Sequence, residues 1–598
     1  MRGSIDENAC RQILAPDATV RFRDRSTRNL NPLAKIVRFC NNARTFRLLR
    51  LRSIIPAILT LIFASGVMVP NFAFAADGPG KLAPTPPMGW NDWAHYQCAF
   101  TAQTILSNAK ALVKTGLAAD GYNTVTIDDC WMQKARDAQG NLQVDPERFP
   151  HGMKPIVEAV HGMGLKFGIY EDAGYATCGG FAGSGEPDGG GKDHFLQDAR
   201  LFASWGVDYL KLDGCNLYVP RGDTHDAVYR RAYAAESAAL KTVGRPIVFS
   251  ESAPAYFQGT PDWYSVLDWV RDYGQLWREG TDVAIFRSKK PDNPRFHSVL
   301  WNYSYNLPLG RFQKPGNWND ADFIIGGDRG MTLPETRSQL ALWSMMSAPL
   351  ILSSDLDRLN SQAVAILSNK AVLAVDQDAL GRMATLIRRN RNMDVLFKPL
   401  SGGDYAVAVL NHGSSSISVE LHPADFGFAS NAKCRVDARN LWSGKHQSAT
   451  SALHASIAAD DTEIWRIHPG VSCGMASRTG VITMIAPGDT DKMHGYSRCL
   501  TSSRVVEECK GAGVESWTVQ ASGALESAGR CLDIADGKPT MQPCAAGNAV
   551  RWKYTLPGNL VSADGACLTV TGPDSSPQRL VMQACGHNQA NQIWSLPN

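Results

Sequence analysis

The sequence predicts an α/β protein: a barrel of eight strand–helix units, then an antiparallel β-sandwich, then a repetitive β-domain. Three observations predict this order. Short apolar runs alternate with amphipathic segments as far as Asp376, then apolar and polar residues alternate one by one, and finally a cysteine motif recurs three times. A chain of 598 residues is expected to hold several domains.

The segment 1–75 is predicted to be a secretory leader. An arginine-rich stretch, 44–52, precedes an apolar stretch, 54–69, and small residues end at Ala75, where we expect cleavage. The alternative, an uncleaved membrane anchor, is less favoured because the apolar stretch is short for a bilayer span. We therefore expect an exported protein, secreted or periplasmic, without a stable membrane anchor.

The segment 76–376 is predicted to form a (β/α)8 TIM barrel. Strand-like runs alternate with helix-like segments; the strands are 124–127, 165–170, 207–212 and 246–249, and the helices are 102–114, 153–163, 194–205 and 226–242. Repeated units of this kind imply a parallel sheet, and about 300 residues suit one barrel. An open doubly wound sheet is the alternative, but no GxGxxG follows a strand. A strongly apolar helix of the outer ring is expected over 339–350.

From 377 to 470, apolar and polar residues alternate between Gly, Ser and Asp turns, which predicts an antiparallel sandwich. This segment concentrates no potential catalytic groups, so we interpret it as structural. A linker is expected over 471–481.

The segment 482–598 contains a repeat of Arg498-Cys-Leu-Thr, Arg530-Cys-Leu-Asp and Ala566-Cys-Leu-Thr. A second cysteine follows each motif, and each unit closes on a tryptophan. Three such units resemble the ricin-type β-trefoil, a lectin fold. The resemblance implies one disulfide within each repeat: Cys499–Cys509, Cys531–Cys544 and Cys567–Cys585.

The same resemblance implies at most one sugar-binding site. In this fold the aspartate after Cys-Leu contacts sugar, and only Asp533 fills that position, with Asn548 as its helper; Thr501 and Thr569 replace it in the other repeats. The closing tryptophans are expected in the core instead: Trp517, Trp552 and Trp594.

Composition narrows the classes of partner. The net charge of +3 gives no electrostatic footprint for nucleic acid. Fifteen Trp and sixteen Tyr suit sugar rings, although large cores use aromatics too. Twelve cysteines remain after the leader, an even number that suggests disulfides in an exported protein. No CxxC pair is present, so a zinc site has little support. Neither a metal nor a cofactor is among the groups that we expect.

The stretch 204–215 holds the strongest catalytic candidate. An apolar run reaches Asp213 and breaks at Gly214, which places Asp213 at the carboxyl end of a barrel strand. Lys211 lies two residues earlier on the same face, where its ammonium would keep Asp213 ionised as a nucleophile requires. An ordinary strand-end salt bridge is the alternative.

Further carboxylates gather at predicted strand ends: Asp128, Asp129, Asp172, Asp282, Asp320 and Asp322. Clustered carboxylates serve divalent-metal chemistry or glycoside hydrolysis. The interleaved Trp and Tyr, and the absence of His beside these carboxylates, favour a sugar substrate.

Five motifs come in the order seen in family 27 glycoside hydrolases: Pro86-Pro-Met-Gly-Trp90-Asn, Ile127-Asp-Asp-Cys-Trp131, Lys211-Leu-Asp-Gly-Cys215, Arg278-Glu-Gly-Thr-Asp282 and Trp318-Asn-Asp-Ala-Asp322. The chain resembles this family, which contains melibiase-type α-galactosidases and α-N-acetylgalactosaminidases. The resemblance implies a retaining enzyme that removes terminal α-galactosyl residues from an oligosaccharide or polysaccharide, and the leader implies that this enzyme is exported.

The resemblance also implies roles for single residues. Asp213 matches the nucleophile, Asp282 the general acid/base, and Asp128 with Asp129 the pair that grips the galactose 4- and 6-hydroxyls. Other pocket residues are Trp90, Tyr170, Lys211, Arg278 and Asp322. Two barrel disulfides are implied, Cys98–Cys130 and Cys178–Cys215. Whether Cys434 and Cys473 pair with each other is left open.

The sequence departs from the family beside the sugar 2-position, where galactosidases have Cys-Glu-Trp-Pro. Aligned on Pro254, the small residues Ser252 and Ala255 resemble an acetamido pocket, next to Tyr256. When the sequences are aligned on Glu251 instead, this residue retains the contact that the galactosidase glutamate makes with the 2-hydroxyl. We favour α-galactosidase; the alternatives are α-N-acetylgalactosaminidase, β-L-arabinopyranosidase, or a non-catalytic sugar-binding protein acting through the trefoil.

A general acid must hold a proton, so burial and the neighbouring carboxylate should raise the pKa of Asp282. Arg278 opposes that shift, and the sequence does not say which effect is larger.

Overall fold

The structure is a computed structural model that describes residues 82–186, 192–284, 295–429, 433–484, 498–544, 551–572 and 577–597. The expected leader and Asn548 lie outside the described residues. Within these ranges, no helix has the length and apolar character to cross a membrane.

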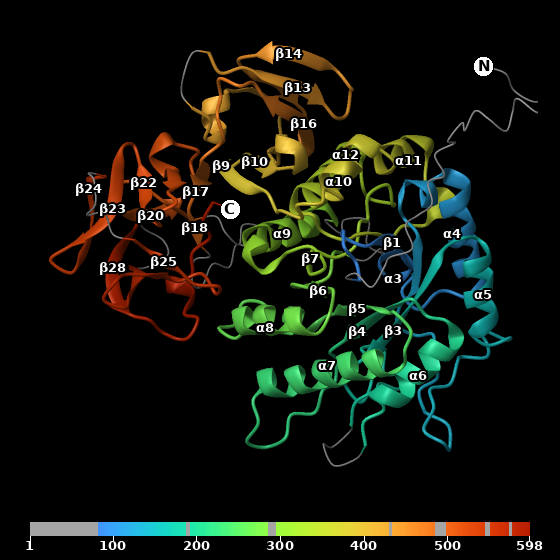
Figure 1. Cartoon of the computed structure of the whole chain (residues 1–598). Helices are drawn as coiled ribbons and strands as arrows, with labels where there is room; N and C mark the ends of the chain where they lie inside the picture. The colour runs from blue at the N-terminus through green and yellow to red at the C-terminus, as the bar shows by residue number, and fades with distance from the viewer. Residues whose placement is uncertain are drawn as a thin grey trace, which may run out of the picture. The chain divides into compact units, whose positions relative to one another are not determined.

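Eight parallel strands form the barrel, as predicted (Figure 1). They are β1 (Met88–Asn91), β2 (Thr124–Ile127), β3 (Lys166–Asp172), β4 (Tyr209–Asp213), β5 (Val248–Glu251), β6 (Leu276–Arg278), β7 (Trp318–Asp320) and β8 (Leu350–Leu352). Strands pair in the order β7-β6-β5-β4-β3-β2-β1-β8. A parallel bridge between Ile324 and Leu352 joins the chain after β7 to β8, so the sheet closes on itself.

Helices follow the strands and lie outside them (Figure 1). They are α3 (Trp93–Tyr96), α4 (Ala102–Thr115), α5 (Lys154–Gly162), α6 (Phe195–Trp205), α7 (His225–Thr242), α8 (Trp263–Trp269), α9 (Arg295–Asn306), α10 (Leu333–Met346), α11 (Ser361–Leu367) and α12 (Lys370–Asp376).

The apolar helix expected over 339–350 has different bounds. It begins at Leu333, because Thr332 and Glu335 form a capping box, and it ends at Met346, because Ser347 adopts a left-handed conformation with φ of 49°. Leu350 begins β8 instead. Both segments are buried, so apolar residues continue past the end of the helix. The sequence pattern therefore does not show where the helix ends.

The next strands form an antiparallel sandwich, as predicted. They are β9 (Thr385–Asn390), β10 (Met393–Pro399), β11 (Tyr405–Asn411), β12 (Ile417–Leu421), β13 (Val436–Asn440), β14 (His446–Thr450), β15 (Leu453–Ile457) and β16 (Asp461–Pro469). Six strands pair in the order β14-β13-β16-β11-β10-β9, and β12 pairs with β15.

The C-terminal part is all β, in two antiparallel sheets. Its strands are β17 (Arg478–Val481), β18 (Thr483–Met484), β19 (Arg498–Leu500), β20 (Val505–Glu508), β21 (Ser516–Val519), β22 (Leu525–Ser527), β23 (Arg530–Ala535), β24 (Lys538–Pro543), β25 (Lys553–Tyr554), β26 (Leu560–Val561), β27 (Ala566–Thr571) and β28 (Gln578–Ala584). β17 lies within the stretch expected to be a linker and pairs with β21.

The three closing tryptophans are core residues, as expected. Trp517, Trp552 and Trp594 are buried, and each indole N–H donates to the carbonyl of the leucine in its own Cys-Leu motif. This repeated contact explains why the tryptophan recurs at the end of each unit.

Six disulfides join the described cysteines, with Cα–Cα distances from 4.5 to 5.5 Å. Five are the pairs that the two resemblances implied. The sixth joins Cys434 to Cys473, the pair that was left open.

Candidate active site

Asp213 is the last residue of β4 and is half-buried. Its Oδ1 accepts hydrogen bonds from the Tyr256 hydroxyl (2.6 Å) and the Gly214 backbone N–H (2.9 Å), and its Oδ2 accepts one from the Tyr170 hydroxyl (3.0 Å). Three donors to one carboxylate stabilise its negative charge. Asp213 therefore has three hydrogen-bond donors and remains accessible to a ligand.

Lys211 does not pair directly with Asp213, contrary to the simplest expectation. Its Nζ donates to Asp128 Oδ2 at 2.7 Å. Burial disfavours the ammonium, but the Asp128 and then the Asp213 carboxylate outweigh this effect and raise the pKa of Lys211. The lysine stays charged and acts on Asp213 only at longer range.

Asp128 and Asp129 follow β2 and are buried. Asp128 also accepts from Asn91 Nδ2 at 2.7 Å, and Asp129 accepts from the backbone N–H groups of Cys130 (2.6 Å) and Gly179 (2.8 Å). Burial raises the pKa of Asp129, and the Gly179 N–H opposes that rise. The two carboxylates are fixed by separate donors.

Arg278, at the end of β6, contacts two carboxylates. It donates to Asp282 Oδ1 at 2.9 Å, and it lies 2.9 Å from Asp322 Oδ1. Burial, opposed by Arg278, raises the pKa of Asp322 to about 7.

The pKa of Asp282 shifts in the opposite direction to that of Asp322. Its side chain is 57% exposed. Burial raises the pKa of Asp282, but Arg278 and then Lys211 outweigh this effect, so the pKa is lowered. The opposition that the sequence left open is thus decided in favour of Arg278 in the free protein.

Trp90, expected in the pocket, is fully buried, and its indole N–H donates to the Ser354 carbonyl. The tryptophan that reaches the site is Trp93, on α3, whose side chain hydrogen bonds to Asp282. The sequence reasoning missed Trp93, although Asp92 and Trp93 directly follow the quoted motif.

The register of β4 and β5 decides between the two alignments at the 2-position. In the register of the two strands, Lys211 lies beside Ser250 and Leu212 beside Glu251. Ser252 therefore shares a face of the sheet with Asp213, while Glu251 points to the opposite face. Glu251 is fully buried against the backbone of Gly274. The alignment that retained Glu251 as a sugar contact is therefore wrong.

Ser252 is buried, and its hydroxyl has no hydrogen-bond partner among the described residues. Ala255 is half-buried, and Tyr256 is 39% exposed with its hydroxyl on Asp213. Burial, then the charge of Asp213, raises the pKa of Tyr256, so the phenol remains a donor.

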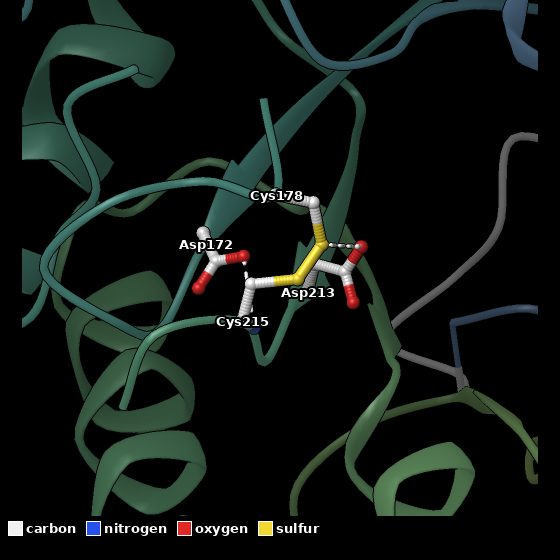
Figure 2. Close-up of side chains that lie close together, drawn as sticks. All are labelled: Asp172, Cys178, Asp213 and Cys215. Carbon is white, nitrogen blue, oxygen red and sulfur yellow. Dashed lines mark hydrogen bonds between the residues drawn. A yellow bond between two sulfur atoms is a disulfide. The ribbon is translucent and has the colours of Figure 1, made fainter. Parts of the chain in front are cut away.

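One group of side chains has the spacing of a metal site: Asp172, Cys178, Asp213 and Cys215 (Figure 2). The two cysteines form a disulfide, and disulfide sulfurs carry no thiolate charge. The group therefore does not fit a thiolate-bound metal.

In the trefoil, Asp533 lies on β23, half-buried, and its Oδ1 accepts from the Ile534 N–H at 2.7 Å. Thr501 and Thr569, its counterparts, are buried and hydrogen bond to backbone carbonyls. Neither threonine is available to a sugar.

Comparisons with known proteins show which family and fold the chain is similar to. Family models match three segments: "Alpha galactosidase A" at residues 85–378, "Alpha galactosidase C-terminal beta sandwich domain" at 390–467 and "Ricin-type beta-trefoil lectin domain" at 491–594. A probable alpha-galactosidase A of Aspergillus clavatus is 38% identical over 541 residues, 89% of this chain and 97% of the relative. The alpha-galactosidase A of Aspergillus niger is 37% identical over 532 residues, 87% of this chain and 92% of the relative.

Among solved structures, alpha-galactosidase I from Mortierella vinacea superposes with a TM-score of 0.58 at 29% identity, covering 66% of this chain and 99% of that chain. The Saccharomyces cerevisiae α-galactosidase solved with raffinose has a TM-score of 0.55 at 25% identity, covering 65% of this chain and 98% of that chain. The chain therefore belongs to the α-galactosidase A family and is a glycoside hydrolase.

Proposed function

We propose that this protein is an exported, retaining α-galactosidase that removes terminal, non-reducing α-D-galactosyl residues by double displacement. Asp213 is the nucleophile and Asp282 the general acid/base. The observation that carries the proposal is the set of three donors on the half-buried Asp213, together with a second carboxylate, Asp282, that Arg278 holds.

In the first step, Asp213 attacks the anomeric carbon while Asp282 protonates the leaving oxygen. The hydrogen bonds from Tyr256 and Tyr170 orient the Asp213 carboxylate for this attack. In the second step, Asp282 takes a proton from water, and that water displaces Asp213. Two inversions retain the α-configuration.

We assign the galactose 4- and 6-hydroxyls to Asp128 and Asp129. Charge-assisted hydrogen bonds discriminate strongly between epimers, because a misplaced hydroxyl leaves a buried charge unpaired. Lys211, Tyr170, Arg278 and Asp322 complete the pocket, and Trp93 replaces Trp90 as its tryptophan. Ser252, Ala255 and Tyr256 border the 2-position.

The trefoil is proposed to bind polysaccharide through Asp533. The export signal rests on the leader pattern, and the six disulfides support passage through an oxidising compartment.

The catalytic pair is tested with Asp213→Asn and Asp282→Ala. Asp213→Asn should lower kcat by about 10³-fold or more, because the covalent intermediate cannot form. Asp282→Ala should spare substrates with good leaving groups, which need little protonation. The first product anomer, observed by NMR, should be α. A β product or an active Asp213 variant would refute the assignment, and faster cleavage of the nitrophenyl α-N-acetylgalactosaminide than of the galactoside would overturn the substrate.

A further inference from the structure

Asp172 is a buried carboxyl beside the nucleophile that the proposed reaction does not use. It ends β3, directly paired in register with Asp213 at the end of β4. The two side chains share a face, and one oxygen of each lies within 4.8 Å of the other (Figure 2). Asp172 is 0% exposed, whereas Asp213 is half-buried.

The Asp172 carboxyl links two turns. Its Oδ1 accepts from the Gly174 N–H at 2.7 Å, and its Oδ2 accepts from the Cys215 N–H at 3.0 Å. These turns touch backbone to backbone, since a Cβ added at Gly174 would lie 1.8 Å from the Cys215 carbonyl oxygen. Asp172 thus fixes Cys215 against the neighbouring strand end.

Cys215 in turn contacts the groups around the nucleophile. Its Sγ lies 3.0 Å from the Tyr256 hydroxyl, which donates to Asp213. Its disulfide partner, Cys178, places a sulfur 3.9 Å from Asp213 Oδ2. The position of Cys215 therefore affects both the disulfide that lies beside Asp213 and the Tyr256 hydroxyl that donates to Asp213.

Two carboxylates this close do not both ionise readily. Asp213 has three donors, and the Tyr170 hydroxyl lies nearer to it (3.0 Å) than to Asp172 (3.4 Å). Burial, and then the charge of Asp213, raise the pKa of Asp172 well above its usual range. Among the described residues, the other titratable groups with a resolved interaction with Asp172 are all acids or phenols: Asp129, Glu171, Tyr170, Tyr229, Tyr233 and Tyr256.

We propose that Asp172 is a positioning residue that stays neutral during turnover, holds the turns at Gly174 and Cys215, and so leaves the negative charge of the carboxyl pair on Asp213. The inference rests on the proposed role of Asp213 as nucleophile. It adds to the catalytic pair, Asp213 and Asp282, a further carboxyl that determines whether the nucleophile carries the negative charge.

The test compares Asp172→Asn and Asp172→Leu in the full chain, using kcat and kcat/KM for nitrophenyl α-galactoside against pH. Asparagine is neutral and keeps a carbonyl acceptor, so kcat should stay within about tenfold of wild type. The acid limb of the pH–rate profile should not move. Leucine accepts no hydrogen bond, so kcat should fall about tenfold further.

An acid limb that moves down by about one unit or more in Asp172→Asn would show that Asp172 is charged in the wild type, and would overturn the proposal. Equal rates in the Leu and Asn variants would overturn its positioning role. If the Leu variant does not fold, the acid limb of the Asn variant decides alone.

Glu236→Gln is the matched control, because Glu236 is a buried carboxyl on α7 whose pKa is also raised by burial. Its pH profile should equal that of wild type. Wild-type protein without activity on galactosides would refute the proposed function instead, so the two failures are distinguishable.

Discussion

At the scale of single residues, Arg278 determines the charge of Asp282 in the free protein. It lowers the pKa of that carboxyl, although a general acid needs its proton. A bound galactoside would cover the exposed Asp282 and exclude water, which favours the neutral form.

The alkaline limb of kcat should therefore lie at higher pH than the alkaline limb of kcat/KM. The first reports the complex and the second the free enzyme. Steady-state kinetics from pH 3 to 8 with a slow natural galactoside measures both limbs. Limbs at the same pH would show that substrate does not change the ionisation of Asp282.

Glu251 gives a residue-scale prediction about stability. Burial raises the pKa of this carboxyl well above that of an unfolded glutamate. The folded state binds the proton more tightly, so stability is fully present below the unfolded pKa and is lost as pH rises toward the folded pKa. The slope from one such group reaches about 1.4 kcal/mol per pH unit.

Glu251→Gln should therefore lose less thermal stability than wild type between pH 5 and pH 7. Scanning calorimetry at the two pH values measures the difference. Exposed Glu147→Gln is the control and should follow wild type. An unchanged pH dependence in Glu251→Gln would mean that Glu251 is already ionised in the folded protein.

At the scale of elements, Asp328 connects two segments that carry the site. It contacts His95 Nδ1 on α3 at 2.8 Å and accepts from Arg295 on α9 at 2.6 Å. Arg295 also donates to the Ala284 carbonyl, two residues after Asp282, and α3 carries Trp93. Asp328 thereby ties Trp93 and Asp282 to a common support.

Asp328→Ala should lower kcat about tenfold or more, and more for poor leaving groups than for nitrophenol, because the acid/base carboxyl loses its alignment. Rates on raffinose and on nitrophenyl galactoside give the comparison. Asp223→Ala, which removes an exposed ion pair with Arg231, is the control. Equal losses on both substrates would indicate a general loss of folded protein.

At the scale of the whole molecule, the trefoil is attached to the barrel as well as to the sandwich. Arg311 donates to the carbonyls of Leu556 (2.6 Å) and Pro557 (2.7 Å), and Ile593 belongs to the core cluster of the barrel. A truncation must also retain Cys473, because it pairs with Cys434.

A chain ending at Ser477 should hydrolyse a small galactoside at nearly the full rate, with a lower melting temperature because the Arg311 contacts are lost. Its action on a galactose-bearing polysaccharide should weaken, since a tethered second site raises the effective concentration. Asp533→Ala should reproduce the polymer defect without the loss of melting temperature. Loss of small-substrate hydrolysis on truncation would make the trefoil a structural part of the enzyme.

Sequence patterns and motifs were enough to predict the fold class, the strand ends near Asp128, Asp213 and Asp320, and the cysteine pairs implied by the two resemblances. These depend on local pattern and motif order: a buried strand reads as an apolar run, and its carboxyl end is the next polar residue.

The side-chain contacts of the site could be read only from the folded protein. Lys211 pairs with Asp128 and not with Asp213, Glu251 points away from the site, and Trp93 contacts Asp282 while Trp90 is buried. The orientation of Glu251 depends on the register between β4 and β5, because a shift of one residue exchanges the two faces. Neither the register nor the competition between burial and Arg278 at Asp282 is encoded in any single segment of the chain.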